Sequence, residues 1–308
     1  EKISRQLLDQ STNLSHSIKL DFNFDIIPLK YLINLLGDLP NPWSKLSDID
    51  INQWASWAEF DKKTLNWIWC LKPLDPISLL EGLFDSNSSM FINLSGQNQL
   101  LLNELASIEL PLNVKANIGT PTFLEPVSLF APSRQPSPNT EIYAEHILNQ
   151  SKRLILGRSG ITIVLLNDQE LRVQLTAQLA AEFGKRVIHE KTTPDDNGVI
   201  CCHWNWWIEH QDLLPIPEQL IVALLPFPSL QSPLTSSRVE SFKREGRDWF
   251  RDLLLPEALS LLPQAVAPIR NSYSRLAILD GRLRSRSWGE EFLRTLEPWT
   301  PLHRLLPR

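Results

Sequence analysis

Residues 160–168 have the sequence GITIVLLND, and they decide the fold class of this chain. The strongly apolar run from Ile161 to Leu166 is typical of a parallel strand that is covered on both faces. Asp168 follows this run and can cap a helix, because its carboxylate accepts hydrogen bonds from the free amide groups of a first helical turn. Gly184 is placed to end that helix. A buried strand followed by a capped helix predicts a parallel α/β unit.

The same alternation extends outward on both sides of this stretch. The apolar patterns predict strands at 126–131, 186–190, 199–203, 220–225 and 275–280, and helices at 141–156, 168–184, 235–254, 257–266 and 288–296. Strands that alternate with such helices indicate a parallel sheet with helices on both faces.

The part of the chain before residue 131 looks different. Ile27 begins an apolar pattern that suits a helix ended by Gly37, and Trp54, Trp57 and Phe60 fall at helical intervals. Further elements are a strand at 66–72, a helix opened by Asp75 and Pro76, a strand at 90–94 and a helix at 97–108. The Pro- and Ser-rich segment 131–140 is the best boundary. We therefore predict a mainly helical segment at 1–130 and an α/β domain at 131–308.

Composition narrows the function classes. The chain has 308 residues and a net charge of -5. Residues 1–150 carry 10 Lys and Arg against 17 Asp and Glu, whereas residues 151–308 carry 20 against 18, so the halves have charges of -7 and +2. This asymmetry permits an anionic partner for the second half.

The ends and the cysteines of the chain give further expectations. It begins with Glu1 and contains a single Met, Met90, so we interpret it as a fragment or a processed product. No apolar run has the length that a membrane helix needs, and no signal peptide is apparent, so we expect no membrane partner. Three cysteines are too few for a disulfide framework or an iron-sulfur site, and we expect a reduced, cytoplasmic setting.

Standard catalytic and phosphate-binding motifs are absent from the sequence. It contains no GxxxxGK[ST], GxGxxG, GxSxG or HExxH. The tract from Cys201 to His203 holds soft ligands, but neighbouring residues on a strand point to opposite faces and cannot all meet one ion. We therefore predict no metal site.

The segment HWNWWIEHQDLLP at 203–215 carries three tryptophans beside Glu209 and Asp212. It follows a predicted strand, and ligands bind at the carboxyl ends of parallel strands. The alternative is that Trp204, Trp206 and Trp207 are packing residues.

A second segment, QAVAPIRNSYSRLAILDGRLRSRSWGEEFL at 264–293, is rich in arginine. Such a group suits the phosphates of a nucleotide or a nucleic acid. The alternative is a solvated face whose charges pair within the chain. The arginines concerned are Arg270, Arg275, Arg282, Arg284 and Arg286.

Taken in order, these pieces resemble the C-terminal half of an XPD/DinG-type superfamily 2 DNA helicase. Residues 160–168 stand where that family has a strand ending in a phrase like LVLFTSY. Residues 207–212 resemble its fifth motif, FWEGVD, with the glycine replaced by His210. Leu225-Pro226-Phe227 matches the family's LPF.

The sixth motif is matched in part. Gln264 stands at its first position, Ala267 and Pro268 replace its Gly-Arg pair, and the pattern resumes at Ile278-Leu279-Asp280-Gly281-Arg282. Upstream, residues 73–76 resemble a PLDV phrase that leads into the first motor lobe, and residues 94–97 occupy the place of the third motif.

The resemblance implies a RecA-like second motor domain of an ATP-dependent DNA helicase. Residues 1–130 would then be an accessory segment with the returning tail of a first motor lobe, and a first motor domain upstream in the same polypeptide would hold most of the ATP and Mg²⁺. Single-stranded DNA is the implied partner. The implied roles are nucleotide contact and catalysis for Gln264 and Arg270, coupling for Glu209 and Asp212, and nucleic-acid contact for Arg282, Arg284 and Trp207.

Two alternatives remain open. Because Pro268 stands where the family has an arginine, the chain could be a helicase-like nucleic-acid-binding or scaffold module without ATPase activity. The other alternative is an unrelated α/β enzyme, such as a nucleotide-sugar transferase, that uses the region of Glu209 and Asp212.

Overall fold

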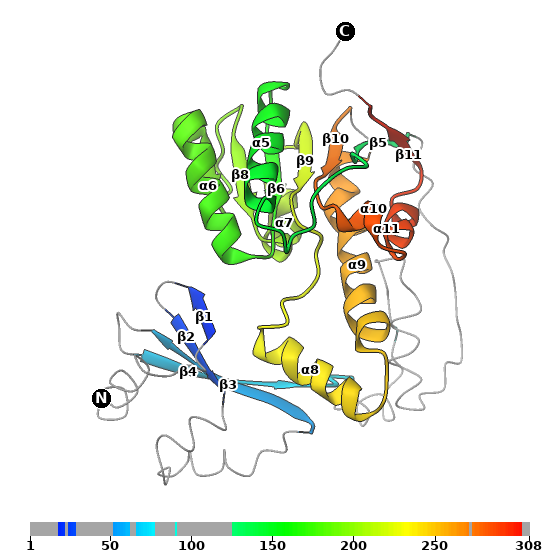
Figure 1. The fold of residues 1–308 in the computed structure, drawn as a ribbon. Coiled ribbons are helices and arrows are strands. Elements are labelled where there is room, and N and C mark those ends of the chain that lie inside the picture. The colour runs from blue at the N-terminus through cyan, green and yellow to red at the C-terminus, as the bar shows by residue number, and fades with distance from the viewer. Residues whose placement is uncertain are drawn as a thin grey trace. The chain divides into compact units, whose positions relative to one another are not determined.

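The computed structural model describes residues 18–21, 24–28, 52–61, 66–77, 90, 125–270 and 273–303. The chain divides into two compact units (Figure 1). The first, here called the antiparallel unit, comprises residues 1–91, 99–113 and 229–253, and the second, the α/β unit, comprises residues 92–98, 114–228 and 254–308.

The α/β unit is built on a seven-stranded sheet in which every described pairing is parallel. This confirms the predicted fold class. In spatial order its strands are β11 (Trp299–Pro301), β5 (Val127–Phe130), β10 (Arg275–Ile278), β9 (Gln219–Val222), β6 (Thr162–Leu165), β8 (Val199–Cys202) and β7 (Val187–His189).

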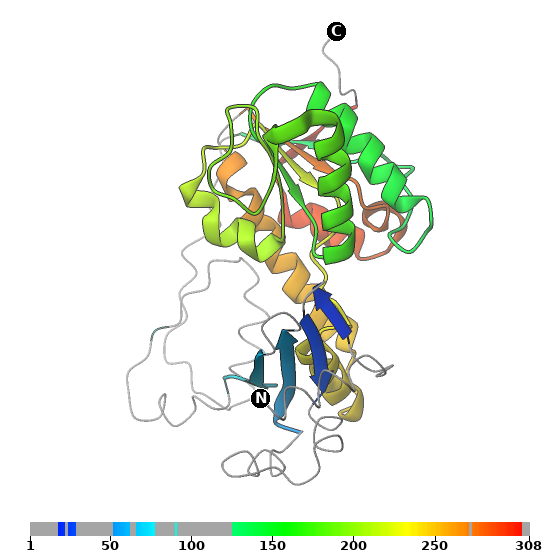
Figure 2. The ribbon, with the colours of Figure 1, turned by 90° about the vertical axis from the view of Figure 1, so that its left-hand side faces the viewer.

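Helices cover both faces of this sheet (Figure 2). Most of the helices and strands of the unit lie within a few residues of their predicted ranges. The strand β11 and the helices α7 and α10 were not predicted. The helices of the unit are α5 (Tyr143–Leu156), α6 (Gln169–Phe183), α7 (Trp204–His210), α9 (Leu255–Val266), α10 (Arg282–Ser285) and α11 (Gly289–Thr295).

The boundaries of α6 follow directly from its sequence. Asp168 is its N-cap, and the carboxylate accepts a hydrogen bond of 2.8 Å from the backbone amide of Leu171. Gly184 ends the helix with a φ of 67°, a left-handed backbone conformation that glycine adopts without a steric penalty. The helix therefore starts and stops where local chemistry dictates.

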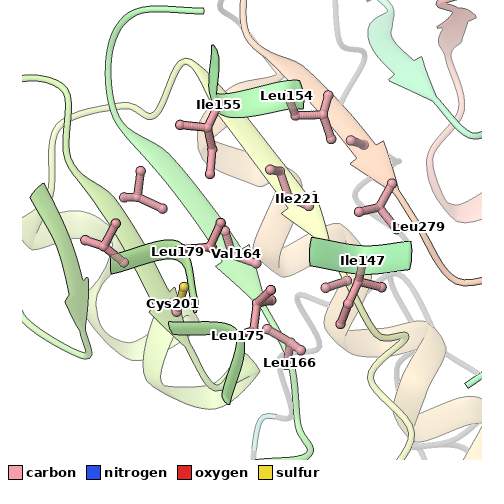
Figure 3. Close-up of a cluster of buried hydrophobic side chains, with 14 of the residues drawn as sticks. Ile147, Leu154, Ile155, Val164, Leu166, Leu175, Leu179, Cys201, Ile221 and Leu279 are labelled. Carbon is pink, nitrogen blue, oxygen red and sulfur yellow. The ribbon is translucent and has the colours of Figure 1, made fainter. Parts of the chain in front are cut away.

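The main core lies between the sheet and helices α5 and α6 (Figure 3). Val164, Cys201 and Ile221 come from three neighbouring strands and contribute fully buried side chains to it. The alternate strand residues Ile163 and Leu220 are also fully buried, so both faces of the sheet are covered. Burial on both faces explains why the strands have no polar alternation.

The antiparallel unit corrects the prediction for residues 1–130. Its described elements are mostly strands, in the order β1 (Ile18–Asp21), β2 (Phe24–Pro28), β3 (Trp54–Asp61) and β4 (Asn66–Pro73), and α8 (Pro233–Arg244) belongs to the same unit. The helical interpretation of residues 54–60 was wrong, because all of them lie in β3. There, pairing with β4 along eight positions outweighs the helical spacing of three aromatic residues.

Several other expectations can be compared with the structure. The strand at 66–72 is confirmed as β4. Asp75 accepts a hydrogen bond of 3.1 Å from the amide of Ile77 in a turn. The helix predicted at 27–37 was wrong at its start, because Ile27 lies in β2, and Met90, where a strand at 90–94 was predicted, has no regular secondary structure. The rest of these two elements and the helix predicted at 97–108 lie outside the described residues.

The helix predicted at 235–254 is interrupted. It ends at Arg244 in α8, and Gly246 then takes a left-handed φ of 70°. A short π-helical turn, Phe250–Leu254, follows and leads into α9. This interruption separates the part of the chain that belongs to the antiparallel unit from α9.

The segment 131–140 does not separate the two compact units. β5 precedes it and is a strand of the parallel sheet, so the segment runs within the α/β unit. Among the described residues, no helix is long and apolar enough to cross a membrane.

Candidate functional site

The buried carboxylate of Asp280 organises the carboxyl edge of the sheet. Asp280 comes two residues after β10 and is 0% exposed. Its Oδ2 accepts a hydrogen bond of 3.0 Å from the amide of Leu225, beyond β9. Its two oxygens also accept from Arg282, at 2.7 Å from Nη2 and at 3.0 Å from both Nε and the backbone amide. One carboxylate thus fixes the loops after two adjacent strands, and we call this arrangement the Asp280 clip.

The segment 131–140 closes over the Asp280 clip. Gln135 Nε2 donates to the carbonyl of Ile278 at 2.9 Å, and the amide of Gly281 donates to the carbonyl of Pro136 at 3.2 Å. A Cβ atom at Gly281 would lie only 2.3 Å from the carbonyl oxygen of Gln135. Glycine is therefore required at this position by close backbone approach.

An aromatic group borders the clip. The guanidinium of Arg282 lies 5.0 Å from the ring centre of Phe227, within cation–π range. Phe227 also packs edge-on against Trp288 and Phe292, at centroid distances of 5.0 and 5.7 Å. Arg282 is therefore held by a carboxylate and a ring, and its side chain is only 25% exposed.

Arg284 has a different environment from Arg282. It lies in α10, and its side chain is exposed, as is that of Arg286. Arg275 is buried at the start of β10, where Nε donates to Gln219 Oε1 at 2.8 Å and Nη2 donates to the carbonyl of Leu154 at 2.7 Å. Of the late arginines, Arg284 and Arg286 are thus the accessible cations at the carboxyl edge in the described part of the chain, with Arg282 partly accessible.

The tryptophans of α7 have two different roles. Trp204 and Trp207 are 0% exposed, and their Nε1 atoms donate to the carbonyls of Leu224 at 3.1 Å and Ala265 at 2.9 Å. The indole of Trp207 is thus buried and bonded to α9, and its contact with nucleic acid stays a prediction. Trp206 is only partly buried. Glu209 and Asp212, the predicted coupling residues, are exposed on α7 and on the 3₁₀ turn Gln211–Leu213.

The sixth-motif residues Gln264 and Arg270 both donate hydrogen bonds to backbone carbonyls within the α/β unit. Gln264 donates to the carbonyl of Ser260 in its own helix at 2.8 Å. Arg270 is 3% exposed and donates to the carbonyl of Thr295 at 3.3 Å, and burial lowers the pKa of its guanidinium. The structure thus places Arg270 inside the unit, between η6 (Ala267–Ile269) and the end of α11, and its catalytic role stays a prediction.

A polar network that the sequence analysis missed supports the start of α7. Arg172 in α6 is 7% exposed, donates to the carbonyl of Leu166 at 3.1 Å and lies 3.6 Å from Glu190 Oε1. Glu190 in turn accepts from the amide of His203 at 2.9 Å. His203 Nδ1 accepts from the amide of Asn205 at 3.1 Å and so caps α7. The network joins the carboxyl ends of β6, β7 and β8, and no motif spacing indicates it.

The cysteine tract is structural. Burial raises the pKa of Cys201 to about 12 and also raises that of Cys202 above its usual range. Both thiols are therefore protonated, which does not suit metal binding. In the part of the chain that the structure describes, no group of three His, Cys, Asp or Glu side chains is arranged to hold a metal ion.

The parallel strands of the α/β unit, covered by helices on both faces and followed by polar loops, give it the architecture of a RecA-like domain. Among solved structures, Xpd4 of S. tokodaii matches with a TM-score of 0.51 at 14% identity, covering 93% of this chain and 62% of that chain.

Comparisons of sequence find similarity to helicases in part of the chain. Residues 217–299 match the family model described as helicase C-terminal domain. The ATP-dependent DNA helicase YoaA of Haemophilus influenzae is 32% identical over 126 residues, which are 40% of this chain and 20% of that protein. The Escherichia coli YoaA is 39% identical over 82 residues, 26% of this chain and 13% of that protein. Residues 217–299 are thus similar to a helicase C-terminal domain, and the chain matches a fifth or less of the length of these relatives.

The Asp280 clip predicts unequal effects for two neighbouring arginines. Arg282→Ala leaves a buried carboxylate without its guanidinium, so we expect the free energy of unfolding to fall by about 3 kcal/mol. Arg284→Ala removes an exposed side chain and should change it by no more than about 0.5 kcal/mol. Urea unfolding followed by circular dichroism measures both.

A double variant tests the pairing itself. The variant with both Asp280→Ala and Arg282→Ala should lose clearly less unfolding free energy than the sum of the losses in the two single variants, because the two side chains contact each other. Additive losses would show that the pair does not stabilise these loops.

The cap at His203 predicts a pH dependence. Burial and the Arg172 charge lower the pKa of His203 from 6.5, against the opposing effects of Glu190 and Glu209. Because the folded protein binds this proton less readily than the unfolded chain, stability is present above pH 6.5 and is lost as pH falls through the lowered value. His203→Asn keeps a good N-cap without this titration, so its unfolding free energy should fall less between about pH 8 and pH 5.

The control for this measurement is His303→Asn, a change at an exposed histidine. The unfolding free energy of this variant should depend on pH in the same way as that of the wild-type chain. Equal pH profiles for His203→Asn and the wild type would contradict the role of His203.

Proposed function

We propose that this chain forms the nucleic-acid-contacting C-terminal part of an ATP-dependent DNA helicase that acts on single-stranded DNA. The observation that carries the proposal is the helicase C-terminal match over residues 217–299, which includes the Asp280 clip and the exposed Arg284 and Arg286. These cations lie at the carboxyl edge of a parallel sheet, where such folds bind ligands.

A companion motor domain, in this proposal, holds most of the ATP and Mg²⁺. Arg270 is 3% exposed and Gln264 donates a hydrogen bond within α9, which supports placing most nucleotide contacts in the companion domain. We therefore assign this chain nucleic-acid contact and coupling, with Glu209 and Asp212 as exposed groups on the coupling segment. A cytoplasmic location remains part of the proposal.

The degenerate module without ATPase activity is the second candidate. Two observations favour it: Pro268 supplies no charge, and the nearby Arg270 is buried. The nucleotide-sugar transferase alternative is set aside, because no sugar-nucleotide or metal motif in the sequence supports it and residues 217–299 match a helicase C-terminal domain.

Salt dependence tests the DNA contact. We expect the 308-residue chain to bind a fluorescent oligo-dT with an affinity that falls steeply with salt, because cations release counterions from the phosphates. Arg284→Ala should reduce the slope of log affinity against log salt by about 0.7, the value for one phosphate contact on a single strand. Fluorescence anisotropy measures both quantities.

Lys185→Ala is the matched control, since it also removes one exposed positive charge. Lys185 lies in η3 (Gly184–Arg186), before the amino end of β7, and not at the carboxyl ends of the strands. Its slope should equal that of the wild type. If the two variants had the same slope, or if wild-type binding did not respond to salt, Arg284 would not be a phosphate contact.

Restoring the sixth motif separates the two candidates. In the polypeptide that joins this chain to its companion motor domain, Ala267→Gly with Pro268→Arg should raise DNA-stimulated ATP hydrolysis at least tenfold, because an arginine at a transition-state phosphate is worth about a thousandfold or more. Residue 268 is only partly buried, so an arginine there can extend outward. Pro268→Ala, which adds no charge, is the control, and no gain in the restored variant would favour the module without ATPase activity.

A further inference from the structure

A cleft opens beside α7, within the α/β unit. Its volume is about 410 Å³, which falls in the range of small-ligand sites. One wall is the loop that follows β7, and the other wall is formed by α7 and the turn after it. The lining residues are Glu190, Lys191, Thr192, Thr193, Trp206, His210 and Leu213.

The α7 wall carries an aromatic platform. The rings of Trp206 and His210 are stacked, with centroids 4.6 Å apart and an interplanar angle of 12°. His210 Nδ1 lies 2.8 Å from the carbonyl oxygen of Trp206, which fixes the imidazole ring. Trp206 is partly exposed, whereas Trp204 and Trp207 on the same helix are fully buried. Packing accounts for the two buried rings and leaves Trp206 as the tryptophan that a ligand can reach.

The opposite wall is suited to an anion. Lys191 is exposed, and Thr192 and Thr193 add hydroxyl groups that can donate hydrogen bonds. The acidic lining residue, Glu190, is balanced by Arg172 at 3.6 Å and by the amide of His203 at 2.9 Å. A phosphate near Lys191 would therefore meet a cation without facing an unbalanced carboxylate.

We propose that this cleft holds one nucleotide of a bound DNA single strand, with its base stacked on the Trp206–His210 platform and its phosphate at Lys191. The inference rests on the proposed function and deepens it by naming a contact outside the Asp280 clip. An aromatic ring can stack on any of the four bases, which suits a protein that moves along DNA of any sequence. The size of the cleft admits a single nucleotide.

Fluorine NMR tests this contact directly in the 308-residue chain. The protein is labelled with 5-fluorotryptophan, and Trp206→Phe identifies the resonance of Trp206 among the 11 tryptophans. Adding oligo-dT should shift this resonance. The resonance of Trp249, which is partly buried and lies outside the cleft, is assigned in the same way with Trp249→Phe and should not move.

Affinity measurements accompany the spectra. Trp206→Ala should weaken oligo-dT binding roughly tenfold, the effect of one lost base stack. Lys191→Ala changes an exposed residue that does not endanger folding, and it should reduce the salt slope by about 0.7. Trp249→Ala should bind DNA as the wild type does.

Three outcomes would overturn the inference, and they are distinguishable. If oligo-dT binds but neither the Trp206 resonance nor the affinity of Trp206→Ala and Lys191→Ala changes, the cleft is not a DNA contact, while the proposed function stands. If neither the wild-type chain nor any variant binds oligo-dT, both the proposed function and this inference are wrong. If thymidine monophosphate alone shifts Trp206 at the same concentration as oligo-dT, the cleft is a site for free nucleotide.

Discussion

The carboxylate of Asp280 is the interaction on which the carboxyl edge of the sheet depends. It is fully buried, and its two oxygens accept hydrogen bonds from Leu225 and Arg282. A charge in such surroundings is tolerated only when it is paired and hydrogen-bonded. Because the donors come from the loops after β9 and β10, and Gly281 is bonded to the segment 131–140, removing this one charge would release three loops together. The clip is thus a structural requirement for any surface built from these loops.

A second set of contacts links α7 to α9, the helix that carries Gln264. The indole of Trp207 donates to the carbonyl of Ala265, the residue after Gln264, so α7 is tied to α9. At the other end of α7, His203 caps the helix and is itself held by Glu190. The short helix α7 is thus held both at its start and along one side. Under the proposed function, a strand that enters the cleft beside Trp206 would therefore act on α9 through α7, while Glu209 and Asp212 stay exposed.

Sequence alone predicted those parts of the structure that local chemistry decides. The strand at 161–166, the cap at Asp168 and the stop at Gly184 all follow from short-range patterns, and the structure confirms them. The helical interpretation of residues 54–60 failed, because pairing between β3 and β4 is a tertiary effect that three aromatic residues do not report. The network of Arg172, Glu190 and His203 was missed for a related reason: it joins residues from three strand ends, and only the folded sheet brings them together.

The arginines show most clearly where sequence reasoning about a site stops. The five arginines of segment 264–293 that the sequence analysis singled out carry the same charge, but their environments in the structure differ. Arg270 and Arg275 are buried and bind backbone carbonyls, Arg282 neutralises Asp280, and Arg284 and Arg286 face solvent. A guanidinium already committed to a buried partner cannot leave it for a phosphate without leaving that partner unsatisfied. Under the proposed function, nucleic-acid contacts made by the loop after β10 therefore depend on the exposed pair, and the buried Arg270 can supply a charge in place of Pro268 only if α11 and η6 move apart.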